Sequence, residues 1–363
     1  GTWSKKRKGV SHQMKTTNDD TSIAQLRRIS SSYLNNDGKH IVPRMLQSDA
    51  HGYTCAAETP EGADCGLVYS LASTARITRQ SSVDELMMLL PFEFQDEKKQ
   101  AYTLFDPHGR VVGYLKDVDV ALKAFLKFRR SLSIDPFVSY FKDDVLRELR
   151  IFCDLGRLVR PLIVIENLHK IPKIIEQNTH NLLTSLLAAG CIEYVSATEE
   201  RTLKPTFVFG DVFANKGHTH LEISDVSFVG IIAAQSPFFR HNQGPRLVYW
   251  IGMSKQAIWC STQDDLGAAT THNLWYGQKS VVTTNTSKIL NMDQIATCTN
   301  CTVIFYPLDY NQEDALILNR ASVDKGMFVS DSMRTYDAQK QGTDNHLSGE
   351  TFENPKKGNT FGM

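Results

Sequence analysis

A polar, turn-forming hexapeptide stands directly before an apolar stretch in the second half of the chain, and it constrains the local fold more than any other feature. The hexapeptide, His241–Arg246, ends in Gly-Pro-Arg, and proline is well suited to the first turn of a helix. The residues up to Ala257 therefore predict a helix that begins near Pro245. Because a helix N-terminus exposes unpaired N–H groups, Arg246 beside it would suit an anion such as a phosphate.

The composition is that of an ordinary globular protein with room for two or three domains. Of the 363 residues, 41% are hydrophobic and 22% are charged, and 40 basic residues balance 40 acidic ones. A nucleic-acid surface would therefore have to come from local clustering of charge. Residues 1–44 show such clustering, and a solvated basic arm is the alternative interpretation. The basic residues there are Lys5, Lys6, Arg7, Lys8, Lys15, Arg27, Arg28, Lys39 and Arg44.

The seven cysteines are odd in number and scattered, with no apolar leader before them, which predicts a reduced, intracellular protein. Cys298 and Cys301 have the spacing of metal ligands. No second pair completes the four ligands of a structural zinc site, so buried thiols are the favoured interpretation. Because no run approaches the ~20 apolar residues of a membrane span, we expect a soluble protein without a membrane partner.

Residues 90–205 predict a self-contained α+β domain. Gly190 is a good residue to end a helix, and Pro161 suggests an edge strand or a bulge. Nothing in this block gathers catalytic residue types, so we expect an accessory domain. The elements predicted here are helices over 114–128 and 168–189 and strands over 158–165 and 191–195.

The flanking residues predict two further regions. Residues 1–89 are loop-rich, and loops held on a scaffold often carry functional sites. Residues 206–363 are expected to be rich in strands, at 206–213, 226–234 and 302–306. The expected fold is therefore mixed α+β and multidomain, with boundaries near residues 89 and 205.

Two short motifs carry neighbouring carboxylates. Glu58-Thr-Pro-Glu-Gly62 is a turn with a carboxylate on either side of its proline, and a plain surface turn is the alternative. Glu313 and Asp314 lie between two apolar runs, where they could help to hold a hard cation that bridges to substrate phosphates. An ordinary acidic turn is the alternative there.

Each of these motifs is weak alone, but their order along one chain is specific. Together they resemble the second-largest (β-like) subunit of multisubunit DNA-directed RNA polymerases, and most closely the eukaryotic, archaeal and large-DNA-virus branch. The resemblance covers nearly all of residues 1–330. The motifs that carry it are AETPEG at 57–62, GRLVRPL at 156–162, HNQGPR at 241–246, GMSKQA at 252–257 and YNQEDA at 310–315.

The resemblance implies catalytic roles for three residues. Arg246 matches the arginine that contacts the phosphates of the incoming nucleotide. Asp314, with Glu313 beside it, matches the acidic pair near the second, substrate-borne magnesium ion. Arginine and a carboxylate at these places would act by charge and alignment, as nucleotidyl transfer with two metal ions requires.

Other matching positions imply contacts with nucleic acid. Residues 58–62 resemble the fork region beside the downstream edge of the RNA–DNA hybrid, and residues 90–205 resemble the external domain. Gln256 and Lys255 match positions that line the hybrid. If residues 245–257 stay helical, Arg246 and Gln256 are about 15 Å apart and cannot both contact one nucleotide. The residues expected to bind nucleic acid are Arg27, Arg28, Arg44, Glu61, Lys255 and Gln256.

The implied function is template-directed nucleotidyl transfer by a multisubunit enzyme. The sequence has no Asp-x-Asp-x-Asp triad, which the family places in the largest subunit to bind the first Mg²⁺. The implied partners are therefore the largest and other polymerase subunits, the DNA template, the RNA transcript and nucleoside triphosphates. The implied location is the nucleus or cytoplasm, or a viral factory or virion.

Two alternatives stay open. One is a non-catalytic nucleic-acid-binding or assembly fragment of a polymerase-like complex. The other is a free-standing phosphotransferase, which is disfavoured because the sequence has no P-loop. Gly244 and His51 depart from the usual residues of the family and suggest a divergent, viral lineage. The family's downstream lysine-rich segment and N-terminal domains have no counterpart, so we expect the central part of a subunit or one product of a split gene.

Overall fold

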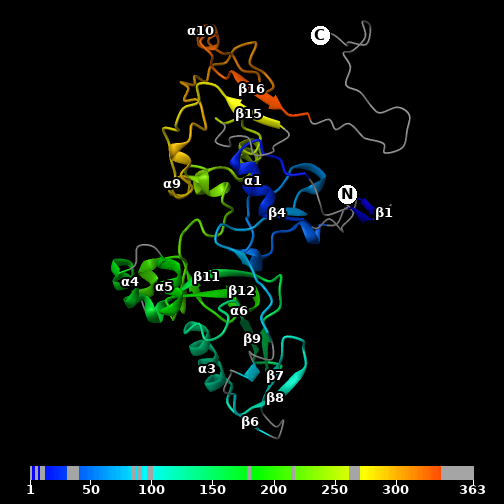
Figure 1. Ribbon diagram of the computed structural model, residues 1–363, viewed down its shortest axis with the longest axis vertical. Helices are drawn as coiled ribbons and strands as arrows, with labels where there is room; N and C mark the ends of the chain where they lie inside the picture. The colour runs from blue at the N-terminus through cyan, green and yellow to red at the C-terminus, as the bar shows by residue number, and fades with distance from the viewer. Residues whose placement is uncertain are drawn as a thin grey trace, which may run out of the picture. The chain divides into compact units, whose positions relative to one another are not determined.

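The computed structural model describes residues 2–4, 7–8, 13–30, 41–82, 87–88, 92–95, 101–177, 181–213, 217–260 and 270–336 (Figure 1). The chain divides into two compact units. The first comprises residues 1–15, 20–256 and 282–293, and the second comprises residues 16–19, 257–281 and 294–363. The described residues contain helices and several separate sheets, which confirms a mixed α+β, multidomain fold.

The described residues before position 90 are rich in loops, as predicted. One helix, α1, and short strand pairs are joined by single turns of 3-10 helix. The pairs β1–β2 and β3–β4 are antiparallel. The elements are β1 (Thr2–Ser4), β2 (Arg7–Lys8), α1 (Asp19–Leu26), β3 (Arg28–Ser30), β4 (Val68–Ser70), β5 (Arg76–Ile77) and 3-10 turns at Val42–Arg44, Ser48–Ala50 and Gly62–Asp64.

A five-stranded sheet with one helix forms the first part of the predicted accessory domain. The strand order is β6-β8-β7-β10-β9, with β7 and β10 parallel and the other neighbours antiparallel. Buried residues of the strands and of helix α3 share one hydrophobic core. The elements are β6 (Phe94–Gln95), β7 (Tyr102–Phe105), β8 (Val111–Leu115), α3 (Val118–Arg130), β9 (Ser139–Asp143) and β10 (Glu148–Phe152).

Helix α3 begins later than the sequence pattern predicted. The Asp117 side chain accepts hydrogen bonds from the backbone N–H groups of Asp119 and Val120, so it caps the helix and fixes its start. Tyr114 and Leu115, which we assigned to the helix, form the end of β8. Val118, Ala121 and Phe125 recur at helical spacing and are buried against the sheet.

A second sheet is built around β11 and has the order β12-β11-β14-β13, with β5 also paired to β11. Pro161 pairs with Tyr194 of β12, but on its other side it falls between the residues that pair with β5 and those that pair with β14. A residue without an N–H group fits such an interruption. The strands are β11 (Leu158–Val164), β12 (Ile192–Ser196), β13 (Pro205–Thr206) and β14 (His220–Leu221).

The single helix predicted over 168–189 is wrong, because the residues form three shorter pieces. Pro172 stands in the first turn of α4, where its missing N–H costs nothing, and it could not continue an earlier helix. The pieces are a 3-10 helix at Ile165–Lys170, α4 (Ile171–Gln177) and α5 (Leu182–Ala188), with residues 178–180 outside the described ranges. Helix α6 (Ala197–Glu200) follows β12.

The three strands predicted beyond residue 206 are also wrong. Residues 206–213 hold only the end of β13 and then α7 (Phe209–Phe213). Residues 226–234 form turns whose apolar side chains enter a core, and periodicity alone cannot distinguish such a short run from a strand. Residues 302–306 have no regular structure and are exposed.

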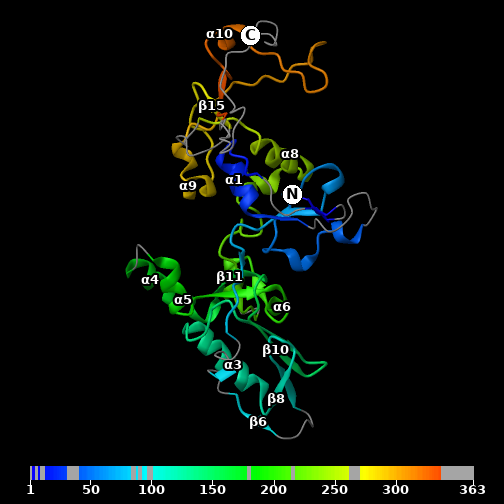
Figure 2. The ribbon, with the colours of Figure 1, turned by 45° about the vertical axis from the view of Figure 1, so that its right-hand side comes forward.

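Helix α8 (Gly244–Ser254), which is labelled in Figure 2, belongs to the first unit. The unit also contains 3-10 turns at Ala233–Gln235 and Phe239–His241, and α9 (Asn285–Ile289). The second unit contains the antiparallel pair β15 (Thr270–Leu274) and β16 (Ser330–Arg334) and helix α10 (Arg320–Asp324). A 3-10 turn lies at Met292–Gln294. No helix in the described ranges combines the length and apolar character needed to span a membrane.

Candidate functional site

Helix α8 places Arg246 in its first turn, as the sequence predicted. Gln243 precedes the helix and its side chain makes no capping hydrogen bond, so no side chain of the N-cap residue satisfies the first N–H groups. Leu247 and Ile251 are buried in a core cluster and hold the helix in place. Arg246 is exposed, with its guanidinium carbon 5.6 Å from the ring centroid of Tyr249. A fixed cation is thus presented to solvent at an anion-favouring helix end.

The other end of α8 is tied into the protein interior. The helix ends at Ser254, three residues earlier than predicted, and the Ser254 hydroxyl donates to the buried Asp20 carboxylate at 2.5 Å. The Lys255 ammonium lies 2.7 Å from Oε1 of the buried Glu58, as an ion pair without a well-aligned hydrogen bond. Gln256 is exposed. Of the two residues expected at the hybrid, Gln256 faces solvent and Lys255 holds an internal partner.

The Glu58–Gly62 turn is braced by its neighbours. The Thr59 hydroxyl donates to the carbonyl of Val68 at 3.1 Å and accepts from the N–H of Gly66 at 2.9 Å. The Arg44 guanidinium donates to two carbonyls just beyond the turn, at 2.7 and 2.8 Å. Glu61 is exposed. The two glutamates of the motif therefore differ, with Glu58 buried and Glu61 facing solvent.

The basic residues of the first 44 positions have unlike surroundings. The Arg27 guanidinium donates to the carbonyls of Ala72 at 2.5 Å and Ser73 at 3.3 Å, and its burial lowers its pKa from the ordinary value. Arg28, on β3, is exposed. Lys5, Lys6 and Lys39 lie outside the described residues. The guanidinium groups of Arg27 and Arg44 thus donate hydrogen bonds to backbone carbonyls. Arg28 is the most exposed of the three residues expected to contact nucleic acid.

Glu313 and Asp314 lie side by side in an exposed turn of the second unit. Both have left-handed backbone conformations, with φ of 52° and 66°, which are uncommon for residues other than glycine. Such conformations are often kept at functional sites. Carboxylates are suitable ligands for Mg²⁺, which usually keeps several waters and uses only one or two protein carboxylates. No group of three potential ligand residues for a metal occurs among the described residues, so a metal here would need further ligands.

Arg246 belongs to the first unit and the Glu313–Asp314 pair to the second, and the geometry of each is defined within its own unit. In the second unit a cavity of about 1180 Å³ is lined on two sides by the segments that flank the acidic turn, 299–308 and 315–319. Both segments are apolar, and Phe305 is 95% exposed. The sequence pattern predicted a strand here and gave no sign that these side chains would lie open.

The cysteines are free thiols. We predicted buried thiols at Cys298 and Cys301, and this is wrong, because Cys298 is only half-buried and Cys301 is exposed. Burial raises the pKa of the Cys298 thiol. The Cys298 thiol donates to the Gln278 carbonyl at 3.5 Å, which is a contact with the backbone and not with a metal ligand.

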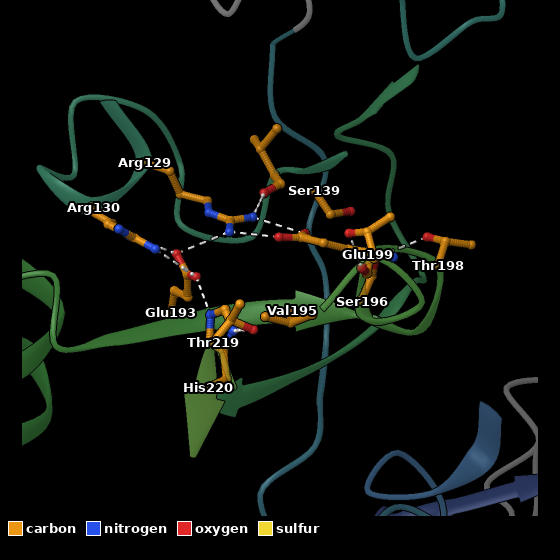
Figure 3. A network of polar contacts seen from close by, with 12 residues as sticks. Arg129, Arg130, Ser139, Glu193, Val195, Ser196, Thr198, Glu199, Thr219 and His220 are labelled. Carbon is orange, nitrogen blue, oxygen red and sulfur yellow. Dashed lines mark hydrogen bonds and ion pairs between the residues drawn. The ribbon is translucent and has the colours of Figure 1, made fainter. Parts of the chain in front are cut away.

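A buried network of charges, which no sequence motif predicted, lies at the junction of the two sheets (Figure 3). Arg129 of α3 donates two hydrogen bonds to Glu199 of α6, at 2.7 and 2.9 Å, and lies 3.1 Å from Glu193 of β12. Glu193 also contacts Arg130 at 3.1 Å and His220 at 2.5 Å. Burial alone would raise the pKa of Glu193, but the neighbouring guanidinium groups hold it well below its usual range.

A second buried cluster involves the GRLVRPL motif. Arg160 contacts Glu200 and Glu222, each at 2.5 Å, and the Tyr53 hydroxyl donates to Glu200 at 2.7 Å. Gly52 has φ of +77°, and a Cβ there would lie 2.6 Å from Nη1 of Arg160. The motif is therefore accounted for by packing, with a glycine that makes room for the arginine.

Three family models match the chain. They are RNA polymerase Rpb2 domain 3 over residues 12–77, domain 4 over residues 108–166 and domain 6 over residues 232–360. These ranges include the Glu58–Gly62 turn, helix α3 with strands β8, β9, β10 and β11, helix α8 and the acidic turn.

Curated relatives agree with these matches. DNA-directed RNA polymerase II subunit 2 of Arabidopsis thaliana is 32% identical over 392 residues, covering 98% of this chain and 32% of the relative. The RPB2 subunit of Encephalitozoon cuniculi is 33% identical over 92% of this chain and 31% of its own length. The archaeal subunit Rpo2 of Sulfolobus acidocaldarius is 31% identical over 94% of this chain and 32% of its own length. The chain spans about a third of the length of these relatives and belongs to the family of second-largest subunits of DNA-directed RNA polymerases.

Proposed function

We propose that the chain is the part of the second-largest RNA polymerase subunit that positions nucleotide phosphates and the RNA–DNA hybrid during template-directed nucleotidyl transfer. The observation that carries this proposal is Arg246, exposed in the first turn of a helix whose preceding residue makes no side-chain cap. Guanidinium and free N–H groups together suit the oxygens of a triphosphate. The enzyme is a nucleotidyltransferase, and this chain supplies alignment and charge.

The acidic turn is the proposed contact for the metal ion that arrives with the nucleotide. Bound Mg²⁺ would neutralise the negative charge that builds up on the phosphates. Asp314, with Glu313 beside it, would hold that ion from the protein side, with phosphate and water oxygens as its remaining ligands. Both carboxylates are exposed and therefore accessible to such a ligand.

The nucleic-acid contacts divide by exposure. Gln256 and Arg28 face solvent and are the proposed direct contacts with the hybrid or template. Glu61 is also exposed, at the tip of the Glu58–Gly62 turn. Lys255 is paired with Glu58 and acts by holding this turn against the end of α8. Arg27 and Arg44 support nearby loops, Arg27 through the carbonyl of Ala72 and Arg44 through that of Ala63.

The chain lacks an acidic triad for the first Mg²⁺, so we propose that the largest subunit supplies it. The other partners are the remaining polymerase subunits, the DNA template, the RNA transcript and nucleoside triphosphates. The site of action would be the nucleus or cytoplasm, or a viral factory or virion. Only the assembled enzyme would be active.

The test is RNA synthesis by the chain with and without its partner subunits. The purified chain should incorporate no nucleotide, and a complex that contains the largest subunit should do so. Replacing Asp314 by alanine in that complex should sharply reduce incorporation at limiting Mg²⁺. Asp324→Ala, which removes an exposed carboxylate of α10, is the matched control. Synthesis by the chain alone would overturn the proposal, and an Asp314→Ala complex with unchanged activity would favour a non-catalytic assembly fragment.

A further inference from the structure

Two successive phenylalanines just before the HNQGPR hexapeptide have opposite environments. Phe239 packs against the core cluster below α8, with its ring 5.8 Å from that of Phe228. Phe238 is 77% exposed. One ring therefore anchors the turn and the other is turned towards solvent, where an apolar side chain gains nothing from folding.

The backbone holds Phe238 in this outward position. The residue has φ of 51° and ψ of 40°, a left-handed conformation that a bulky residue rarely adopts. The Asn242 side chain donates to the carbonyls of Pro237 and Phe238, both at 3.1 Å, and the His241 N–H donates to the Phe238 carbonyl at 2.8 Å. The turn is thus fixed by hydrogen bonds, and the direction of the exposed ring is fixed with it.

The polar His241 ring flanks the exposed Phe238 ring, and Arg240 follows Phe238 two residues later, with its guanidinium over neighbouring rings and 3.7 Å from the Asp225 carboxylate. The His241 imidazole meets the Phe238 ring edge-on, with centroids 6.2 Å apart. The Arg240 guanidinium lies 5.8 Å from the ring of Phe228 and 5.9 Å from that of Phe239, and it donates to the Asp225 carbonyl at 2.5 Å. The Arg240 side chain is still 47% exposed, so it can accept a further contact.

An outward aromatic ring on the same turn as a half-exposed arginine has the properties of a stacking platform for single-stranded nucleic acid. Every base has a flat π face that can stack on such a ring, and a phosphate of the same strand would be attracted to the arginine. A protein partner would require a broad apolar patch, whereas here the ring contacts His241, and Arg240 and Arg246 follow it in sequence. The charge complements a polyanion.

We propose that Phe238 forms a stacking site for an unpaired base of a nucleic-acid strand, and that Arg240 of the same turn contacts a phosphate of that strand. The inference rests on the proposed function, since Phe238 lies a few residues before Arg246, the proposed contact for nucleotide phosphates. The site would accept any base, because a stacked ring reads no hydrogen-bonding edge. It would bind a base that has left its pair and not a closed duplex.

The probe is a single-stranded oligonucleotide that contains one 2-aminopurine, in RNA and DNA forms of the same sequence. The whole 363-residue chain is titrated against it, and anisotropy reports binding while 2-aminopurine quenching reports stacking. We expect binding with quenching for the unchanged chain. A difference between the RNA and DNA arms would identify the preferred strand, and no quenching in either arm would overturn the proposal.

Three substitutions separate stacking from apolar burial. Phe238→Tyr should keep affinity and quenching, whereas Phe238→Leu should remove the quenching and weaken binding by roughly 5- to 100-fold. Phe213→Ala removes another exposed phenylalanine, 71% accessible on α7, and should change nothing. Arg240→Gln should lower the salt dependence of binding by about one phosphate contact while the bound base stays quenched. Wild-type behaviour of Phe238→Leu would overturn the proposal.

An Arg246→Ala arm distinguishes this inference from the proposed function. Unchanged oligonucleotide binding by Phe238→Leu overturns the stacking site, whatever Arg246→Ala does in the same titration. The role proposed for Arg246 is tested in the assembled enzyme, where Arg246→Ala should raise the apparent KM for nucleoside triphosphate. Weakened oligonucleotide binding in Phe238→Leu together with an unchanged KM in Arg246→Ala would leave the stacking site standing and the role of Arg246 wrong. Thermal unfolding of each variant checks that these exposed substitutions leave the fold intact.

Discussion

The charges at the junction of the two sheets and those of the candidate site are arranged in opposite ways. Arg129, Glu193 and Glu199 are buried and contact one another directly. Arg246 and Asp314 are exposed, and each is presented by a helix start or a strained turn. Buried charges are tolerated only when they are paired, so the first group belongs to the stability of the fold. The second group has its charge available, as a ligand site requires.

The largest expected effect is on the buried group. Arg129→Ala would leave Glu193 and Glu199 buried without their main cation, and removing one partner of such a pair costs about 3–5 kcal/mol of the free energy of unfolding. Urea denaturation of the chain measures this. Lys116→Ala, which breaks the exposed pair with Glu93, is the control and should have little effect. Equal losses in the two variants would remove the contrast between buried and exposed charges.

The second prediction concerns the acidic turn. Asp314→Asn in the assembled enzyme should raise the Mg²⁺ concentration needed for half-maximal activity by roughly ten- to a hundredfold, the range for partners of a bound metal. Its free energy of unfolding should not change, because the side chain is exposed. Titration of activity with Mg²⁺ and urea denaturation test the two halves separately. Loss of stability without a change in Mg²⁺ dependence would assign Asp314 to the fold.

The local signals in the sequence predicted the elements that depend on neighbours along the chain. The Gly-Pro sequence in the first turn of α8 placed the start of that helix correctly. The contacts that depend on distant residues were not predictable. Arg129 and Glu199 are 70 residues apart, and no pattern of spacing joins them. The apolar run around Phe305 was predicted as a strand because periodicity does not reveal whether a partner strand exists.

The residues of the candidate site were identified mainly by the family resemblance. The resemblance to polymerase subunits selected Arg246, Asp314 and Lys255, and local chemistry supported the first two but not Lys255. Lys255 shows the limit of such transfer, because its ammonium contacts the buried Glu58. A matching residue type identifies the position but not the partner of the side chain, which depends on the surrounding fold.

The third prediction separates the two residues at the end of α8. Since Lys255 is paired with Glu58, Lys255→Met should leave the salt dependence of nucleic-acid binding unchanged. Arg28→Gln should lower the slope of the logarithm of the binding constant against the logarithm of salt concentration by about one, because its side chain is exposed. Gln256→Ala should weaken binding modestly without changing the slope, since an amide releases no counterion. A lower slope for Lys255→Met would show that Lys255 contacts a phosphate of the nucleic acid.

The smallest expected effect is on acid stability. The pKa of Glu193 is held well below its usual range in the folded state. A carboxyl with a lowered pKa contributes stability above its unfolded pKa of about 4.3, and that contribution is lost as the pH falls below this value. The pKa of Glu199 is raised by burial, so its contribution changes with pH in the opposite direction. Glu193→Gln should therefore flatten the loss of stability below about pH 4.3, whereas Glu93→Gln should not; urea midpoints across this range test it.

Arg246 is proposed to contact the phosphates of the incoming nucleotide. The direct measurement is the rate of nucleotide incorporation against nucleoside triphosphate concentration, for assembled enzymes with Arg246, Arg246→Lys and Arg246→Ala. Losing a charge-assisted contact should raise the apparent KM by roughly ten- to a hundredfold in Arg246→Ala, with a smaller rise in Arg246→Lys. Arg320→Ala, another exposed arginine at a helix start, should leave the KM unchanged. An unchanged KM in Arg246→Ala, with a stable and assembled enzyme, would contradict the account.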